Sequence, residues 1–124
     1  MKNIVSQIIK LPKDFLEQRT KSPYDLLLAS NYADFASKIS VADIYSELKA
    51  TDDKMTEYWL DYSAGQRTSS GWYFTKKDRG YEVGFYNFNR FEQVQTFTDK
   101  QEACAHYIKN EIDGMISRPV SQHQ

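Results

Sequence analysis

The chain has 124 residues, of which 15% are aromatic, and its 16 lysines and arginines nearly balance its 17 aspartates and glutamates. This length predicts one domain, and the balanced charge argues against a general nucleic-acid binder, which normally carries a basic excess. The single cysteine excludes an internal disulfide. Because the first residues are too polar for a secretion signal or a membrane span, we expect a cytoplasmic protein with no membrane partner.

The N-terminal half is predicted to be helical. Residues 1–20 are difficult to assign, because the isoleucines at their start have helical spacing but Pro12 ends any helix that they form. Ser22 followed by Pro23 is typical of a helix start, and apolar residues at steps of three and four continue from there to Ile39. This stripe predicts one amphipathic helix.

Two further helices are predicted before the strands begin. Ser40 is expected to cap a helix over Val41–Lys49. Thr51 is expected to cap the next helix, which Gly65 ends. A short polar connection then leads into the aromatic part of the chain.

Half of the aromatic residues lie between Gly71 and Phe97, in aromatic and β-branched runs that two short turns separate. This pattern predicts an antiparallel meander with one strongly apolar face. The three strands are expected at Trp72–Lys76, Tyr81–Tyr86 and Phe91–Phe97.

A C-terminal helix is predicted to cover the apolar face of the sheet. Thr98–Gln101 has the form of a capping box, and an apolar stripe continues to about Ile116, whereas residues 119–124 are expected to form a frayed tail. The expected fold class is therefore α+β, with N-terminal helices, a three-stranded antiparallel β-meander and a C-terminal helix packed on the sheet. All of it is expected to form a single domain over residues 1–124.

No arrangement of residues in the sequence predicts catalysis, a metal site or a bound cofactor. The histidines His106 and His123 do not have metal-ligand spacing, and Cys104 lies on an apolar helix stripe, where a free cysteine normally packs as a small hydrophobe. We therefore do not expect an enzyme. The enzyme alternative would need a cleft built from side chains such as Glu57, Asp61 and Arg67, whose spacing does not distinguish them from surface pairs.

A second alternative is a small nucleic-acid-binding module that uses residues 79–86. This strand partly resembles the RNA-recognition signature, in which exposed aromatic rings stack on bases. Glu82 and Gly84 depart from that signature, and the order of helices and strands differs from RNA-recognition domains. Nucleic acid is therefore not the expected partner. The basic residues available to such a module are Lys76, Lys77, Arg79 and Arg90.

The charged residues are unevenly distributed along the chain. Between Asp43 and Asp61 there are six acids and two lysines. This stretch is compatible with a solvated helix face or with a docking face for a cationic partner, on which acids steer association. Tyr73 and Tyr86 are placed to add aromatic anchors. The candidate partner-binding residues are Asp52, Asp53, Glu57, Tyr58, Asp61 and Tyr62.

A set of segments extends over roughly Asp52 to Ile112. The segments are WLDYS at 59–63, RTSSGWYF at 67–74, YEV at 81–83, EACA at 102–105 and EI at 111–112. In this order they resemble the small immunity proteins of bacterial polymorphic-toxin and contact-dependent growth-inhibition systems. The resemblance implies a cytoplasmic protein that binds the C-terminal domain of a cognate toxin, often a nuclease, and blocks it without catalysis. It assigns no role to individual residues.

Overall fold

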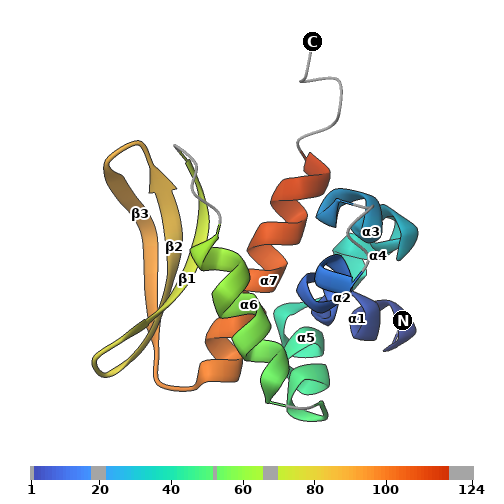
Figure 1. The fold of residues 1–124 in the computed structure, drawn as a ribbon, viewed down its shortest axis with the longest axis horizontal. Helices are drawn as coiled ribbons and strands as arrows, with labels where there is room; N and C mark the ends of the chain where they lie inside the picture. The colour runs from blue at the N-terminus through green and yellow to red at the C-terminus, as the bar shows by residue number, and fades with distance from the viewer. Residues whose placement is uncertain (1, 18–21, 52, 66–69, 118–124) are drawn as a thin grey trace.

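A computed structural model describes residues 2–17, 22–51, 53–65 and 70–117 (Figure 1). The helical part comprises α1 (Lys2–Ile9), α2 (Leu11–Glu17), α3 (Pro23–Ala29), α4 (Tyr32–Phe35), the 3₁₀ turn η1 (Ala36–Lys38), α5 (Val41–Lys49) and α6 (Lys54–Ala64). It is followed by β1 (Ser70–Lys77), β2 (Gly80–Asn87), β3 (Arg90–Phe97) and α7 (Lys100–Ser117). The fold class is α+β, as the sequence predicts.

Two of the predicted helix starts are capping boxes. The Ser22 hydroxyl accepts a hydrogen bond from the backbone N–H of Asp25 at 3.1 Å, and the Asp25 carboxylate accepts from the Ser22 N–H. Ser40 and Asp43 repeat the arrangement at the start of α5. Each box satisfies N–H groups that a helix start leaves without partners, so α3 and α5 begin where the sequence predicts.

The single helix predicted from Ser22 to Ile39 is wrong. The helix is interrupted at Ser30. Its buried hydroxyl donates to the carbonyl of Leu27 at 2.6 Å and accepts from the N–H of Tyr32 at 3.2 Å. Asn31 then adopts a left-handed conformation with φ 65°. A serine hydroxyl that bonds nearby backbone groups competes with the helix, and asparagine tolerates the reversal that follows.

Two further predicted helix starts are displaced by a few residues. The Thr51 hydroxyl donates to the carbonyl of Glu47 at 2.7 Å and closes α5, so α6 begins only at Lys54. At α7 the carboxylate of Asp99, not the hydroxyl of Thr98, accepts from the first N–H groups of the helix. A residue between two helices can cap the end of the first or the start of the second, and the hydrogen bond of its side chain determines which helix it caps.

The sheet has the order β1-β2-β3 with antiparallel pairing throughout. All three predicted strands are present. Their alternating side chains define an inner face, which packs against α6 and α7, and an outer face. The inner face carries Trp72, Phe74, Tyr81, Val83, Phe85 and Phe97. The outer face carries Tyr73, Glu82, Gly84, Tyr86 and Phe91.

The helix α7 lies at the centre of the molecule, with the sheet on one side and the N-terminal helices on the other (Figure 1). Its Tyr107 stacks on Phe74 of β1 with ring centroids 5.8 Å apart and meets Trp59 of α6 edge-on at 5.9 Å. The indole N–H of Trp59 donates to the carbonyl of Ile9 at 2.8 Å and so ties α6 to α1. One continuous apolar core therefore joins the sheet to the N-terminal helices.

Candidate functional site

An open groove with a volume of about 980 Å³ lies beside β1. It lies where the exposed side of α6 meets the edge of the sheet that β2 does not cover. Its charged lining consists of the carboxylates of Glu57, Asp61 and Glu111 and the ammonium group of Lys76. Its aromatic lining consists of Trp72, Tyr73, Phe74, Tyr86 and Phe91. We call it the acidic groove.

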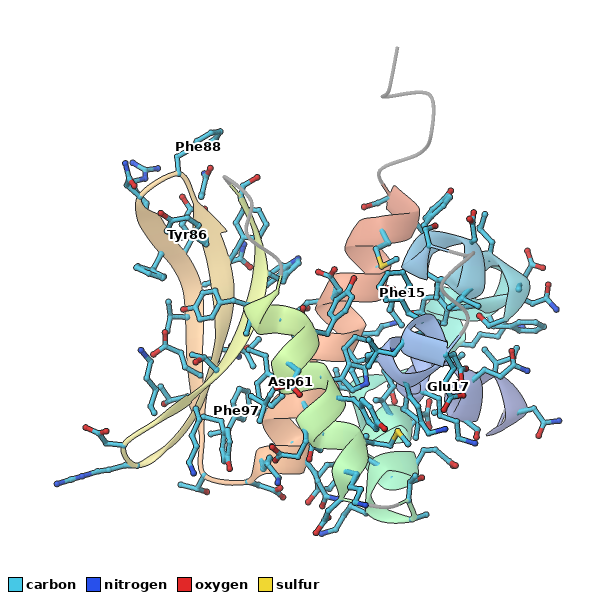
Figure 2. The ribbon with its side chains drawn as sticks, viewed as in Figure 1. Phe15, Glu17, Asp61, Tyr86, Phe88 and Phe97 are labelled. Carbon is cyan, nitrogen blue, oxygen red and sulfur yellow. The ribbon has the colours of Figure 1, made fainter. Side chains whose placement is uncertain are left out.

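The helix α6 supplies two of the carboxylates. Glu57 and Asp61 are four residues apart and lie on one helix face, because residues at this spacing are neighbours on a helix surface. Packing of Met55 and Trp59 in the core turns that face to solvent. Asp61 is exposed on α6 beside the sheet (Figure 2), and no side-chain partner for it is found within the described residues.

The third carboxylate comes from α7. Glu111 is 7% exposed, and its oxygen accepts a hydrogen bond from the hydroxyl of Tyr62 at 3.4 Å. Tyr107 lies four residues before Glu111 on α7. Its hydroxyl is the one buried side-chain oxygen without a hydrogen-bond partner among the described residues. Burial, assisted by the Glu111 carboxylate, raises the pKa of Tyr107 well above its ordinary value. Tyr107 therefore stays protonated.

An aromatic cluster on the outer face of the sheet forms the other wall. Phe91 lies 5.7 Å from Tyr73 and 5.2 Å from Tyr86 between ring centroids. The hydroxyl of Tyr73 donates to the carboxylate of Glu82 at 2.6 Å, which fixes the ring over Gly84. Burial and the neighbouring carboxylate raise the pKa of Tyr73, so it remains a neutral hydrogen-bond donor.

The free edge of β1 is partly satisfied by α6. The N–H of Phe74 donates to the hydroxyl of Ser63 at 2.8 Å, and Ser63 is buried. This bond holds the C-terminal turn of α6 against the strand. The groove is therefore fixed by backbone contacts as well as by side chains.

The structure separates the six candidate residues that the sequence singles out. Glu57 and Asp61 line the acidic groove. Asp53 directly precedes α6, and its carboxylate accepts a hydrogen bond from the side-chain amide of Gln101 at 3.4 Å. The half-buried Tyr58 and Tyr62 pack against the core and do not line the groove. Asp52 lies outside the described residues, as does Arg67.

The acidic stretch is also partly neutralised. Lys100 of α7 forms an ion pair with Glu57 at 2.8 Å. Asp43 is engaged in the cap of α5. Among the described carboxylates of the predicted set, Asp61 is therefore the exposed one without a side-chain partner there.

Two residues of the groove were not among those singled out by the sequence. Phe91 faces Tyr86 in the register of β2 and β3, so strand alternation carried across the second turn could have found it. Glu111 lies four residues after Tyr107, in the middle of the buried stripe of α7. An acid inside an apolar stripe is the signal that could have identified it.

The residues considered for nucleophilic or metal chemistry are packed in the fold. Cys104 is fully buried, which raises the pKa of its thiol well above the ordinary value. The ring of His106 packs on Phe97 with centroids 4.8 Å apart, and Phe97 points from β3 towards α7 (Figure 2). Within residues 2–17, 22–51, 53–65 and 70–117, no three His, Cys, Asp or Glu side chains are grouped to hold a metal ion.

The strand that resembles an RNA-recognition signature places two of its aromatic residues on the inner face. Tyr81 lies 6.1 Å from Phe74, and Phe85 lies 5.1 Å from Trp72 between ring centroids. Tyr86 is the remaining aromatic residue of that strand and lies on the outer face. The rings that the signature would expose therefore pack within the protein instead.

The geometry defines a small α+β protein whose candidate site is a binding groove with acidic and aromatic walls. Comparison of the chain with protein families, with curated proteins and with solved structures finds no match. No helix in the described part of the chain is long and apolar enough to cross a membrane.

Proposed function

We propose that the protein is a non-catalytic binding protein that neutralises a cationic protein partner, as immunity proteins neutralise a toxin domain. The acidic groove is the observation that carries this proposal, because its lining among the described residues combines three carboxylates with an aromatic wall and one lysine. The resemblance of residues 52–112 to immunity proteins of contact-dependent growth-inhibition systems supports the same class.

The chemistry of the groove suits basic side chains. Lysine and arginine bind carboxylates through charge-assisted hydrogen bonds, and their cationic groups are attracted to the faces of aromatic rings. Asp61 and Tyr73 both line the groove, so a basic side chain that binds there has both kinds of group in its surroundings. Carboxylates also accelerate encounter with a positively charged surface.

A nuclease is the toxin class that fits best. Its active site carries basic residues that bind phosphates, and an acidic inhibitor would occupy or shield that cleft. The proposed partner is accordingly the C-terminal domain of a toxin whose gene lies directly upstream of the gene for this protein.

The test is to express that upstream C-terminal domain alone and together with this protein. The domain should stop growth on its own, and co-expression should restore growth. The purified pair should form a tight one-to-one complex by titration calorimetry. Absence of binding between the two purified proteins would overturn the proposal.

Charge reversal tests the groove itself. Asp61→Lys should slow association at least about 10-fold at low salt and weaken its salt dependence, because steering by surface charge is screened by ions. Asp34→Lys is the matched control, since Asp34 is exposed on α4, away from the groove. Equal association rates for the two variants, measured by stopped flow, would remove the acidic groove as the binding surface.

A further inference from the structure

The tip of the β2–β3 hairpin presents two large apolar side chains to solvent. Phe88 is 66% exposed and Phe91 is 65% exposed. Phe88 stands at the far end of the hairpin (Figure 2) and makes no ring contact within the described part of the chain. No ring contact among the described residues therefore accounts for a phenylalanine at this position.

Phe88 also has an unfavourable backbone conformation. Asn87 pairs with Arg90, so Phe88 and Asn89 form a two-residue loop, and their φ angles are 46° and 40°. This is a type I′ turn, which favours asparagine and glycine because positive φ crowds a β-carbon. Asn89 suits the turn, whereas a bulky residue such as Phe88 does not.

The first hairpin turn avoids this cost. Asp78 and Arg79 are not among the described residues with positive φ, and the unusual angle falls on Gly80, with φ 152°. An unfavourable backbone conformation that no contact in the fold offsets is typical of functional sites.

We propose that Phe88 is an anchor that inserts into an apolar pocket on the surface of a basic protein partner. This inference rests on the proposed function and adds to it the apolar contact on which affinity depends. Exposed aromatic residues that enter a partner's pocket are typical binding hot spots.

The surroundings of Phe88 define that partner. Phe91, three residues further on, joins the tip to Tyr86 and Tyr73 and hence to the aromatic wall of the acidic groove. The anchor thus stands at the tip of the hairpin that carries Tyr86 and Phe91 of the groove lining. A partner that covers both the tip and the groove needs an apolar pocket and a basic patch that faces Asp61.

A protein partner fits this surface better than a nucleic acid. The carboxylates of the groove would repel a phosphate backbone that ran along it. Arg90, the basic residue at the tip, is already paired with the carboxylate of Glu92 at 3.3 Å. The rings of Tyr73 and Phe91 meet edge-on, so they do not form a flat platform for successive bases.

The experiment compares two substitutions in the same turn. Phe88→Asn and Asn89→Gly both place a residue that the turn favours, so each should raise the midpoint of thermal unfolding by about 2–6 °C. Only Phe88→Asn removes the anchor. It should weaken partner binding at least about 10-fold, whereas Asn89→Gly should leave affinity unchanged.

The wild type, both turn variants and Asp61→Lys are immobilised and exposed to the purified upstream toxin domain and, separately, to lysate of the source strain. Any protein that the wild type and Asn89→Gly retain, but Phe88→Asn loses, is then purified and titrated against all four. An affinity that depends on Phe88 in that titration supports the anchor. The inference is overturned if no protein depends on Phe88, if the material that depends on it is nucleic acid, or if Phe88→Asn does not stabilise the fold.

The same comparison separates this inference from the proposed function. If the toxin domain binds every form except Asp61→Lys and no other protein depends on Phe88, the anchor is wrong and the proposed function stands. If the toxin domain binds no form and another protein requires Phe88, the proposed function is wrong and the anchor stands.

Discussion

Both faces of the sheet carry aromatic rings, and the two faces differ in what covers them. On the inner face Phe74 is 2% exposed beneath α7, whereas on the outer face Phe91 is 65% exposed. Aromatic residues therefore help to identify the strands, whereas the position of the helices decides which rings are buried and which stay exposed.

The largest effect is expected from Phe74→Ala on the inner face. The ring stacks on Tyr107 and contacts Tyr81, so its removal leaves a cavity in the centre of the core. The free energy of unfolding should fall by about 3–5 kcal/mol, as for other buried phenylalanines. Urea denaturation followed by tryptophan fluorescence measures this change, and a loss below about 1 kcal/mol would contradict the central position of Phe74.

Two glycines of β2 extend the comparison to the backbone. A β-carbon at Gly80 would lie 2.2 Å from the carbonyl oxygen of Phe97, and the φ of 152° disfavours other residues. Gly80→Ala should therefore cost about 2 kcal/mol or more. At Gly84 the obstacle is the ring of Tyr73, whose hydroxyl would lie 2.7 Å from the added carbon and which, unlike backbone, can move outwards by loosening its hydrogen bond to Glu82.

The matched variant Gly84→Ala should thus cost about 1 kcal/mol or less. Thermal unfolding of both variants decides the point. An equal loss at the two positions would mean that the outer aromatic cluster is as rigid as the inner face.

Much of the fold could be predicted from local sequence signals. The strands follow from aromatic alternation, and the starts of α3 and α5 follow from capping boxes at Ser22 and Ser40. The break between α3 and α4 could not be predicted, because the apolar stripe continues across it. The hydrogen bonds of Ser30 and the reversal at Asn31 decide it.

Less of the candidate site than of the fold could be predicted from the sequence. Helical spacing correctly groups Glu57 with Asp61, but the orientation of α6 depends on how Trp59 packs between α1 and α7. That orientation turns Tyr58 away from the groove. The ion pair between Glu57 and Lys100 joins residues far apart in the sequence, so a count of local charges overstates the acidity of this surface.

The helix α7, which packs on the inner face, is held at its N-terminal end by Asp99. The carboxylate of Asp99 accepts hydrogen bonds from the hydroxyl of Tyr45 and from the N–H groups of Gln101 and Glu102. The Tyr45 hydroxyl foremost, and then the backbone donors, lower the pKa of Asp99 below 3.8. Asp99→Ala should lower the free energy of unfolding by about 1 kcal/mol at pH 7.

The dependence of this effect on pH follows from the direction of the shift. A lowered pKa in the folded state means that the stabilisation is complete above the unfolded value of 3.8 and is lost as pH falls through the folded value. The difference between wild type and Asp99→Ala should therefore shrink as pH falls below 3.8. Asp99→Asn retains a cap without a charge, so its stability should follow pH less steeply than that of the wild type in urea denaturation.

The smallest change in stability is expected from Phe91→Ala, which makes the same truncation as Phe74→Ala on the opposite face. The side chain is 65% exposed and contacts only the rings of Tyr73 and Tyr86 among the described aromatic residues. Its removal should alter the free energy of unfolding by about 0.5 kcal/mol, the range of ordinary surface substitutions. Binding to the toxin domain should weaken at the same time, since the ring joins the hairpin tip to the groove. A stability loss comparable to that of Phe74→Ala would show that Phe91 belongs to the core. The outer face would then not be the proposed binding surface.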